Sequence, residues 1–212
     1  MRRVRVKFCG VTRVEDASVA VELGVDAVGV VLTKQSRRFA GLAIARDIRR
    51  ALPPFVTMVT LFMDDEPGWV AEAVATVQPD LLQFHGNESE RDCLRYDCPY
   101  IKAVPMAEIE MAQRVIAEHR AAVGFLLDSH AAGAPGGSGK TFDWTLAPLD
   151  LQRPLILAGG LTCDNVGAAI RTARPYAVDV SSGIESAPGI KDAQKMRRFI
   201  EEVERAGNQE KN

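Results

Sequence analysis

The chain has 212 residues, of which 47% are hydrophobic and 25% are charged, an ordinary balance for a globular protein with one sizeable core. Its formal net charge of −2 provides no basic surface for a polyanion, so we expect no nucleic-acid partner. No run approaches the ~18 apolar residues of a membrane span, and the start "MRRVRVKF" lacks the apolar core of a signal peptide, so the sequence predicts a cytoplasmic protein with no membrane partner.

Eight short apolar runs rich in Val, Ile and Leu follow one another along the chain, and each is typical of a parallel strand covered on both faces. Segments with helical periodicity lie between most of them. The predicted strands are VRVKFCG from Val4, DAVGVVL from Asp26, FVTMVTLFM from Phe55, LLQFHG from Leu81, YIKAVPM from Tyr100, VGFLLDSH from Val123, PLILAGG from Pro154 and YAVDVSSG from Tyr176.

Three of the intervening segments carry clear helix signals. The run from Glu15 to Gly24 has acidic residues early and a glycine at its end, Pro67 begins a second helix, and KDAQKMRRFIEEVERAG predicts a long amphipathic helix near the C-terminus. Strands spaced by roughly 25 residues and alternating with helices predict an α/β fold, a (β/α)8 TIM barrel formed as a single domain by residues 1–212. A doubly wound sheet is less favoured, because no G-x-G-x-x-G turn follows the first strand.

In such a barrel the functional groups lie at the carboxyl ends of the strands. Side-chain alternation predicts that Lys7 and Cys9 point into the barrel, as do Gln83 and His85 of the fourth strand and Asp179 and Ser181 of the eighth. The neighbouring Val6, Phe8, Leu82, Phe84, Val178 and Val180 are then expected to face the helices.

Glycines and serines gather where the seventh and eighth strands end, in LAGGLT and DVSSGIES. Barrels commonly bind phosphate at this position, through backbone N–H groups and the start of a helix, which we expect between Thr162 and Asn165. The sequence therefore predicts a phosphorylated small-molecule substrate, although Gly159-Gly160 alone is also typical of a tight turn. The candidate phosphate-binding residues are Gly159, Gly160, Ser181, Ser182 and Gly183.

A second glycine-rich stretch, HAAGAPGGSGKTFDW, follows the sixth strand without Walker A spacing. We interpret it as a mobile lid, in which Lys140 either approaches the ligand or is solvated.

Two residues are candidates for proton transfer. Asp128 ends an apolar strand, where partial burial is expected to raise its pKa toward that of a general acid; the alternative is a loop cap. A cysteine such as Cys9, taken alone, is more often a packing residue than a catalytic one, but Lys7 beside it is expected to lower its pKa toward that of a general base. We expect His85 to form hydrogen bonds in the site rather than to act as a third acid–base group.

The remaining cysteines and histidines give no sign of a metal or of a disulfide. Cys93 and Cys98 lack a second Cys/His pair, and with three histidines and no H-E-x-x-H motif the sequence predicts no metal site. The stretch SRRF after the second strand offers a guanidinium for a carboxylate; Arg38 is the candidate, whereas Arg37 is equally consistent with a solvated loop.

These motifs, in this order, resemble those of the phosphoribosylanthranilate isomerase family of tryptophan biosynthesis. The resemblance runs from VKFCGVTRVEDA to DVSSGIESAPGIKD through SRRF, LLQFHGNES, IKAV, LLDS, GGSGKTFDW and LAGGLT. It implies an Amadori rearrangement without a cofactor. Cys9 matches the family's general base and Asp128 its general acid, Arg38 matches the arginine that holds the anthranilate carboxylate, and Asp179 matches the aspartate of its last strand.

Two other functions remain open from the sequence. A sugar-phosphate isomerase of histidine biosynthesis has related chemistry but places an aspartate where this chain has Cys9. A catalytically silent barrel that binds a phosphorylated ligand fits the loops but leaves Cys9 and Asp128 unexplained. The sequence is compatible with a monomer or a homodimer.

Overall fold

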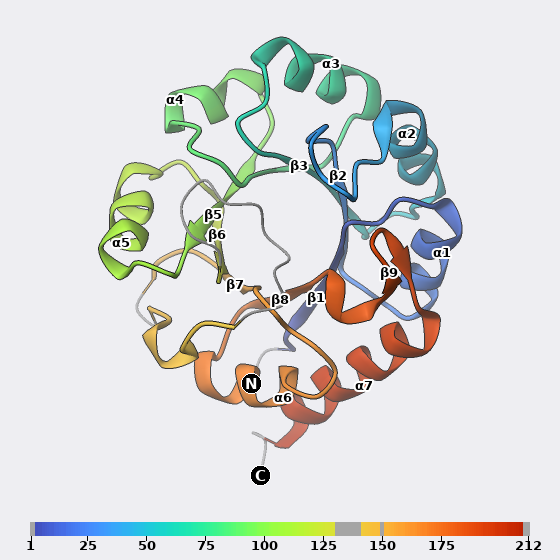
Figure 1. The fold of residues 1–212 in the computed structure, drawn as a ribbon, viewed down its shortest axis with the longest axis vertical. Coiled ribbons are helices and arrows are strands. Elements are labelled where there is room, and N and C mark those ends of the chain that lie inside the picture. Colours follow the sequence, from blue (N-terminus) through green and yellow to red (C-terminus); the bar gives the residue numbers. More distant parts are fainter. Residues whose placement is uncertain (1–2, 130–140, 149–150, 210–212) are drawn as a thin grey trace.

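The computed structural model describes residues 3–129, 141–148 and 151–209, and it contains a closed barrel of eight parallel strands (Figure 1). Neighbouring strands pair in chain order and β1 closes on β8, so the carboxyl ends of all eight strands lie at one end of the barrel. The strands are β1 Arg5–Cys9, β2 Ala27–Val31, β3 Thr57–Phe62, β4 Leu81–Phe84, β5 Tyr100–Pro105, β6 Gly124–Asp128, β7 Leu155–Leu157 and β8 Ala177–Val180.

Helices surround the barrel, as Figure 1 shows; α1 to α6 connect successive strands and α7 follows the last one. Between β6 and β7 the described residues contain one helical element, the 3-10 helix η2, Trp144–Leu146. Of the predicted lid, residues 130–140, which include Lys140, lie outside the described part of the chain. The helices are α1 Val14–Glu22, α2 Gly41–Ala51, α3 Pro67–Val77, α4 Glu90–Cys93 followed by η1 Leu94–Tyr96, α5 Ile109–Glu118, α6 Val166–Ala173 and α7 Ala193–Gln209.

The eight strands confirm the barrel predicted from the sequence, and all three helices predicted with caps are present. The core has two layers. The larger one lies between the sheet and the helices, where Phe8 meets Phe199 of α7 and Phe84 packs on Tyr100. A smaller apolar layer, which includes Ile101, Leu126 and Ile156, lines the inside of β5 to β8.

A small antiparallel hairpin that the sequence did not predict follows β8. The 3-10 helix η3, Ser182–Ile184, leads into β9, Glu185–Ala187, which pairs with β10, Ile190–Lys191, before α7 begins. In Figure 1 the hairpin lies beside the ends of β1 and β8. It therefore brings Glu185 and Lys191 to the candidate end of the barrel.

All four cysteines are free thiols. None of the helices within the described residues has the length and apolar character that crossing a membrane requires.

Candidate active site

Cys9, the last residue of β1, is buried among charged groups. Strand register places Lys7 beside Asp179, and the Lys7 ammonium donates a hydrogen bond to Asp179 Oδ1 over 2.9 Å. Gly29 of β2 lies opposite Cys9, and a Cβ there would stand 2.9 Å from Cys9 Sγ and 3.0 Å from Lys7 Nζ. Gly29 therefore makes room for the thiol and the ammonium side by side, as a glycine within a strand often does.

The electrostatics around Cys9 differ in part from the expectation. Burial raises the pKa of the Cys9 thiol, and Lys7 opposes this effect without overcoming it, while Asp179 adds to it. For Lys7, burial works against the charge, but Asp179 and Cys9 together raise its pKa above the usual value. The prediction that Lys7 lowers the pKa of Cys9 is correct as one contribution and wrong as the net result, because desolvation is larger.

Asp128, the candidate acid, ends β6 and is also buried. Its Oδ2 lies 3.4 Å from His85 Nε2, and its Oδ1 accepts a hydrogen bond of 3.4 Å from Ser129 Oγ. His85 Nδ1 is 3.2 Å from Gln83 Nε2, so the inward residues of β4 hold the ring against Asp128. Each carboxylate oxygen of Asp128 thus has a neighbouring polar group, and the orientation of the carboxyl group is defined from two sides.

The loop after β7 is shaped by two glycines with positive φ, Gly159 at +80° and Gly160 at +64°. A Cβ on Gly159 would lie 2.6 Å from the backbone nitrogen of Ser129 and 3.0 Å from Asp128 Oδ1, so a larger residue would displace the candidate acid. Asn165, which precedes α6, donates to the Gly160 carbonyl over 2.9 Å and fixes the loop against the start of that helix.

The loop after β8 packs tightly on the loop after β7. A Cβ on Gly183 would lie only 2.0 Å from the Leu161 carbonyl oxygen. The Ser181 hydroxyl is buried and has no hydrogen-bond partner among the described residues, and Ser182 begins the 3-10 helix η3. Backbone N–H groups, glycines and an unsatisfied hydroxyl in adjoining loops are suited to a phosphate group.

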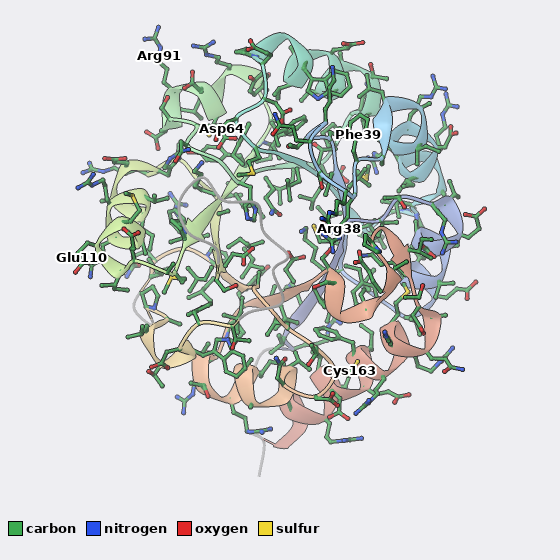
Figure 2. The ribbon with its side chains drawn as sticks, viewed as in Figure 1. Arg38, Phe39, Asp64, Arg91, Glu110 and Cys163 are labelled. Atoms are coloured by element: carbon green, nitrogen blue, oxygen red, sulfur yellow. The ribbon has the colours of Figure 1, made fainter. Side chains whose placement is uncertain are left out.

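Arg38 and Arg37 have different environments. Arg37 is exposed, whereas Arg38 is partly buried and its Nε and Nη2 each donate 2.8 Å to the two carboxylate oxygens of Glu185. Figure 2 places Arg38 at the inner rim of the barrel and its neighbour Phe39 farther out. The Glu185 carboxylate raises the pKa of Arg38, so its charge is secure. Gly10 leaves room for the Arg38 side chain, since a Cβ at position 10 would lie 2.5 Å from Arg38 Cδ.

Three site features were missed in the sequence. Gly29 carried a signal, because a glycine inside an apolar strand indicates a close approach. Glu185 and Lys191 carried none, since their burial depends on a hairpin with no apolar periodicity. Among the described residues, no group of three His, Cys, Asp or Glu side chains is arranged to hold a metal ion.

The comparisons with known proteins agree with one another. A model of the family "N-(5'phosphoribosyl)anthranilate (PRA) isomerase" matches residues 6–202. An N-(5'-phosphoribosyl)anthranilate isomerase of Xanthomonas euvesicatoria pv. vesicatoria is 50% identical over 210 residues, covering 96% of this chain and 95% of the relative.

Two solved structures are also similar over nearly the whole chain. A phosphoribosyl anthranilate isomerase in complex with reduced 1-(o-carboxyphenylamino)-1-deoxyribulose 5-phosphate has a TM-score of 0.84 and 39% identity, covering 95% of this chain and 98% of that one. Monomers generated from the dimeric isomerase of Thermotoga maritima give a TM-score of 0.84 and 38% identity, with the same coverage.

Proposed function

The chain belongs to the N-(5'-phosphoribosyl)anthranilate isomerase family and catalyses that isomerisation in tryptophan biosynthesis, and we propose that Cys9 is its general base and Asp128 its general acid. The observation that carries the assignment is the placement of the two side chains. Both are buried, both point into the barrel, and they end β1 and β6 at the same end of the sheet. The reaction, an Amadori rearrangement, needs one proton given and one proton taken.

In the first step Asp128 gives its proton to the ribose ring oxygen. The bond between C1′ and that oxygen breaks, and the nitrogen lone pair forms a C1′=N iminium ion. Asp128 suits this step because His85 and Ser129 fix its carboxyl group, so the proton can be held toward the substrate.

In the second step the Cys9 thiolate takes the proton from C2′. The electron pair of that bond forms a C1′=C2′ double bond and neutralises the nitrogen, giving an enolamine that becomes the ketone when a proton moves to C1′. Burial opposes the thiolate, whereas Lys7 favours it. The iminium ion, one atom from C2′, adds a second positive charge just when the base is needed.

The two anionic ends of the substrate have separate binding groups in this proposal. Arg38 takes the anthranilate carboxylate, and the loops of Gly159, Gly160, Ser181, Ser182 and Gly183 take the phosphate, with Asp179 and His85 also lining the site. Glu185 occupies Nε and Nη2 of Arg38, so the carboxylate is expected on the Nη1 side.

Replacing Arg38 by Met is expected to raise KM for the isomerase substrate by about 10–100-fold, because a charge-assisted hydrogen bond to the carboxylate is lost, with a smaller change in kcat. Steady-state fluorescence kinetics measure both constants. Arg37→Met is the matched control and is expected to leave KM unchanged, because Arg37 is exposed. Equal effects of the two substitutions on KM would remove Arg38 from carboxylate binding.

Turnover itself is tested by mixing purified protein with freshly made substrate and following the loss of its anthranilate fluorescence. Rapid loss is the expected result. Tight binding of the substrate without turnover would instead support a silent phosphate-binding barrel, and turnover of a histidine-pathway substrate alone would support the other isomerase.

We also infer a cytoplasmic location, one barrel domain over residues 1–212 and a homodimer. For the dimer, Phe55 in the loop before β3 lies at the end of the barrel opposite the candidate site, is fully exposed and has a φ of 73°. A bulky residue is strained in that conformation, and an exposed one gains no packing within its own chain. The loop borders a hollow of about 520 Å³ lined by Leu52, Pro53 and Asp80 among others. The related T. maritima isomerase is described as dimeric.

The substitution Phe55→Asp is expected to convert the dimer to a monomer, because it places a charge in an apolar contact, while kcat stays unchanged at the far end of the barrel. Sedimentation velocity on both proteins measures the change. A monomer already present in the unmutated protein at micromolar concentration would contradict the proposed dimer.

A further inference from the structure

One buried lysine lies beneath the candidate site without taking part in the proposed reaction. Lys191 ends β10, and its side chain has no exposed surface. An ammonium has three hydrogens, and three acceptors surround this one: the Cys9 carbonyl oxygen at 2.6 Å, Glu185 Oε1 at 2.8 Å and the Ser181 carbonyl oxygen at 3.2 Å. With all three donors used, Lys191 has none left for a ligand.

The three acceptors belong to three different parts of the site. Cys9 carries the proposed base at the end of β1, and Ser181 begins the phosphate loop after β8. Glu185 holds the proposed carboxylate-binding side chain, since its two oxygens accept from Nε and Nη2 of Arg38. Two segments at opposite ends of the chain, β1 and the hairpin, thus meet at one nitrogen atom.

Opposite charges hold Lys191, Glu185 and Arg38 together in the interior. Burial lowers the pKa of Lys191, against the pull of Glu185, so the ammonium depends on its hydrogen bonds to stay charged in the interior. Glu185 lies between two cations, Lys191 and Arg38. Removing the ammonium would take a donor from the carbonyl oxygens of Cys9 and Ser181, of which the second keeps the Ile184 N–H at 3.4 Å, and would leave Glu185 with one cation instead of two.

We propose that Lys191 is a positioning residue, which holds the base, the phosphate loop and the carboxylate-binding arginine at fixed distances from one another. The proposal rests on the function proposed above, since those three parts act on one substrate that spans them. A displacement of about 1 Å among reacting groups can cost about 100-fold in rate, so a shared anchor has consequences at every part of the site.

The test compares Lys191→Met with the unmutated full chain in three measurements. They are kcat by the fluorescence assay, and the affinities of inorganic phosphate and of anthranilate by calorimetry. We expect kcat to fall by about 10–100-fold and both affinities to fall by about tenfold, because all three parts lose their common anchor. Circular dichroism and thermal unfolding establish that the variant is folded.

Two further variants separate a shared anchor from a general loss of structure. Glu185→Gln is expected to weaken anthranilate binding and leave phosphate binding unchanged, because the Glu185 side chain links Lys191 to Arg38, the residue proposed to bind the carboxylate. Lys195→Met is the matched control: Lys195 also donates to the hairpin, 2.7 Å to the Glu185 carbonyl oxygen, but from an exposed position. It is expected to leave all three measurements unchanged.

A folded Lys191→Met protein whose kcat and affinities stay within about twofold of the unmutated values would assign Lys191 a purely structural role. A change in only one of the three measurements would equally overturn the shared anchor. If Lys191→Met does not fold, Lys191→Arg, which keeps the charge without the compact three-donor geometry, is judged by the same outcomes. Absence of turnover in the unmutated chain would instead refute the proposed function, and the two affinities would still test the positioning role.

Discussion

Replacement of Cys9 by Ala is expected to lower kcat by about 10²–10⁴-fold, since a general base normally contributes that much to a proton transfer. KM should change little, because the thiol is small and the anionic ends of the substrate bind elsewhere. The substitution also removes few packing atoms, so the free energy of unfolding should fall only modestly. Stopped-flow or steady-state loss of substrate fluorescence measures kcat.

Cys163→Ala is the matched control for the loss of a thiol. Cys163 is buried like Cys9, but it lies in the loop before α6 and its thiol contacts the Lys195 carbonyl rather than a candidate catalytic group. Its kcat should equal that of the unmutated protein. Retention of kcat in Cys9→Ala would leave the isomerase activity in place and remove Cys9 from its role as the base.

The substitution Asp128→Asn is expected to lower kcat by a similar factor, about 10²–10⁴-fold, because the amide keeps the shape of the carboxyl group but cannot give its proton to the ring oxygen. Ring opening then becomes the slow step. Asp164→Asn serves as the control, since Asp164 is an exposed aspartate whose partner is Arg198, at the surface. If Asp128→Asn retained its kcat, another group would have to protonate the ring oxygen.

Much of the barrel could be predicted from the sequence because its strands are marked by patterns of neighbouring residues. Each strand is a short run rich in apolar residues, and alternation within β1, β4 and β8 separated residues such as Phe8, which meets Phe199, from Lys7, which meets Asp179. The rule that barrels act at the carboxyl ends of their strands then placed Cys9 and Asp128 among the candidates, and the family resemblance implied their roles.

The remaining features depend on contacts between distant segments. Glu185 and Lys191 lie in the short hairpin of β9 and β10, which no hydrophobic period marks, and they are buried because β1, β8 and Arg38 converge on them. The direction in which the pKa of Cys9 shifts could not be predicted from Lys7 alone. Desolvation is a property of the assembled barrel, and it outweighs the neighbouring charge.

The assignment of Cys9 as the general base and Asp128 as the general acid is tested most directly with substrate that carries deuterium at C2′. Cys9→Ser replaces the sulfur by an oxygen, and the hydroxyl is a poorer base than the thiolate. Removal of the C2′ proton should therefore limit kcat of this variant, which should show a larger primary isotope effect than the unmutated protein. Asp128→Asn should show no such increase, because ring opening precedes that step. The opposite pattern, with the larger isotope effect in Asp128→Asn and none in Cys9→Ser, would contradict the assignment of Cys9 as the base.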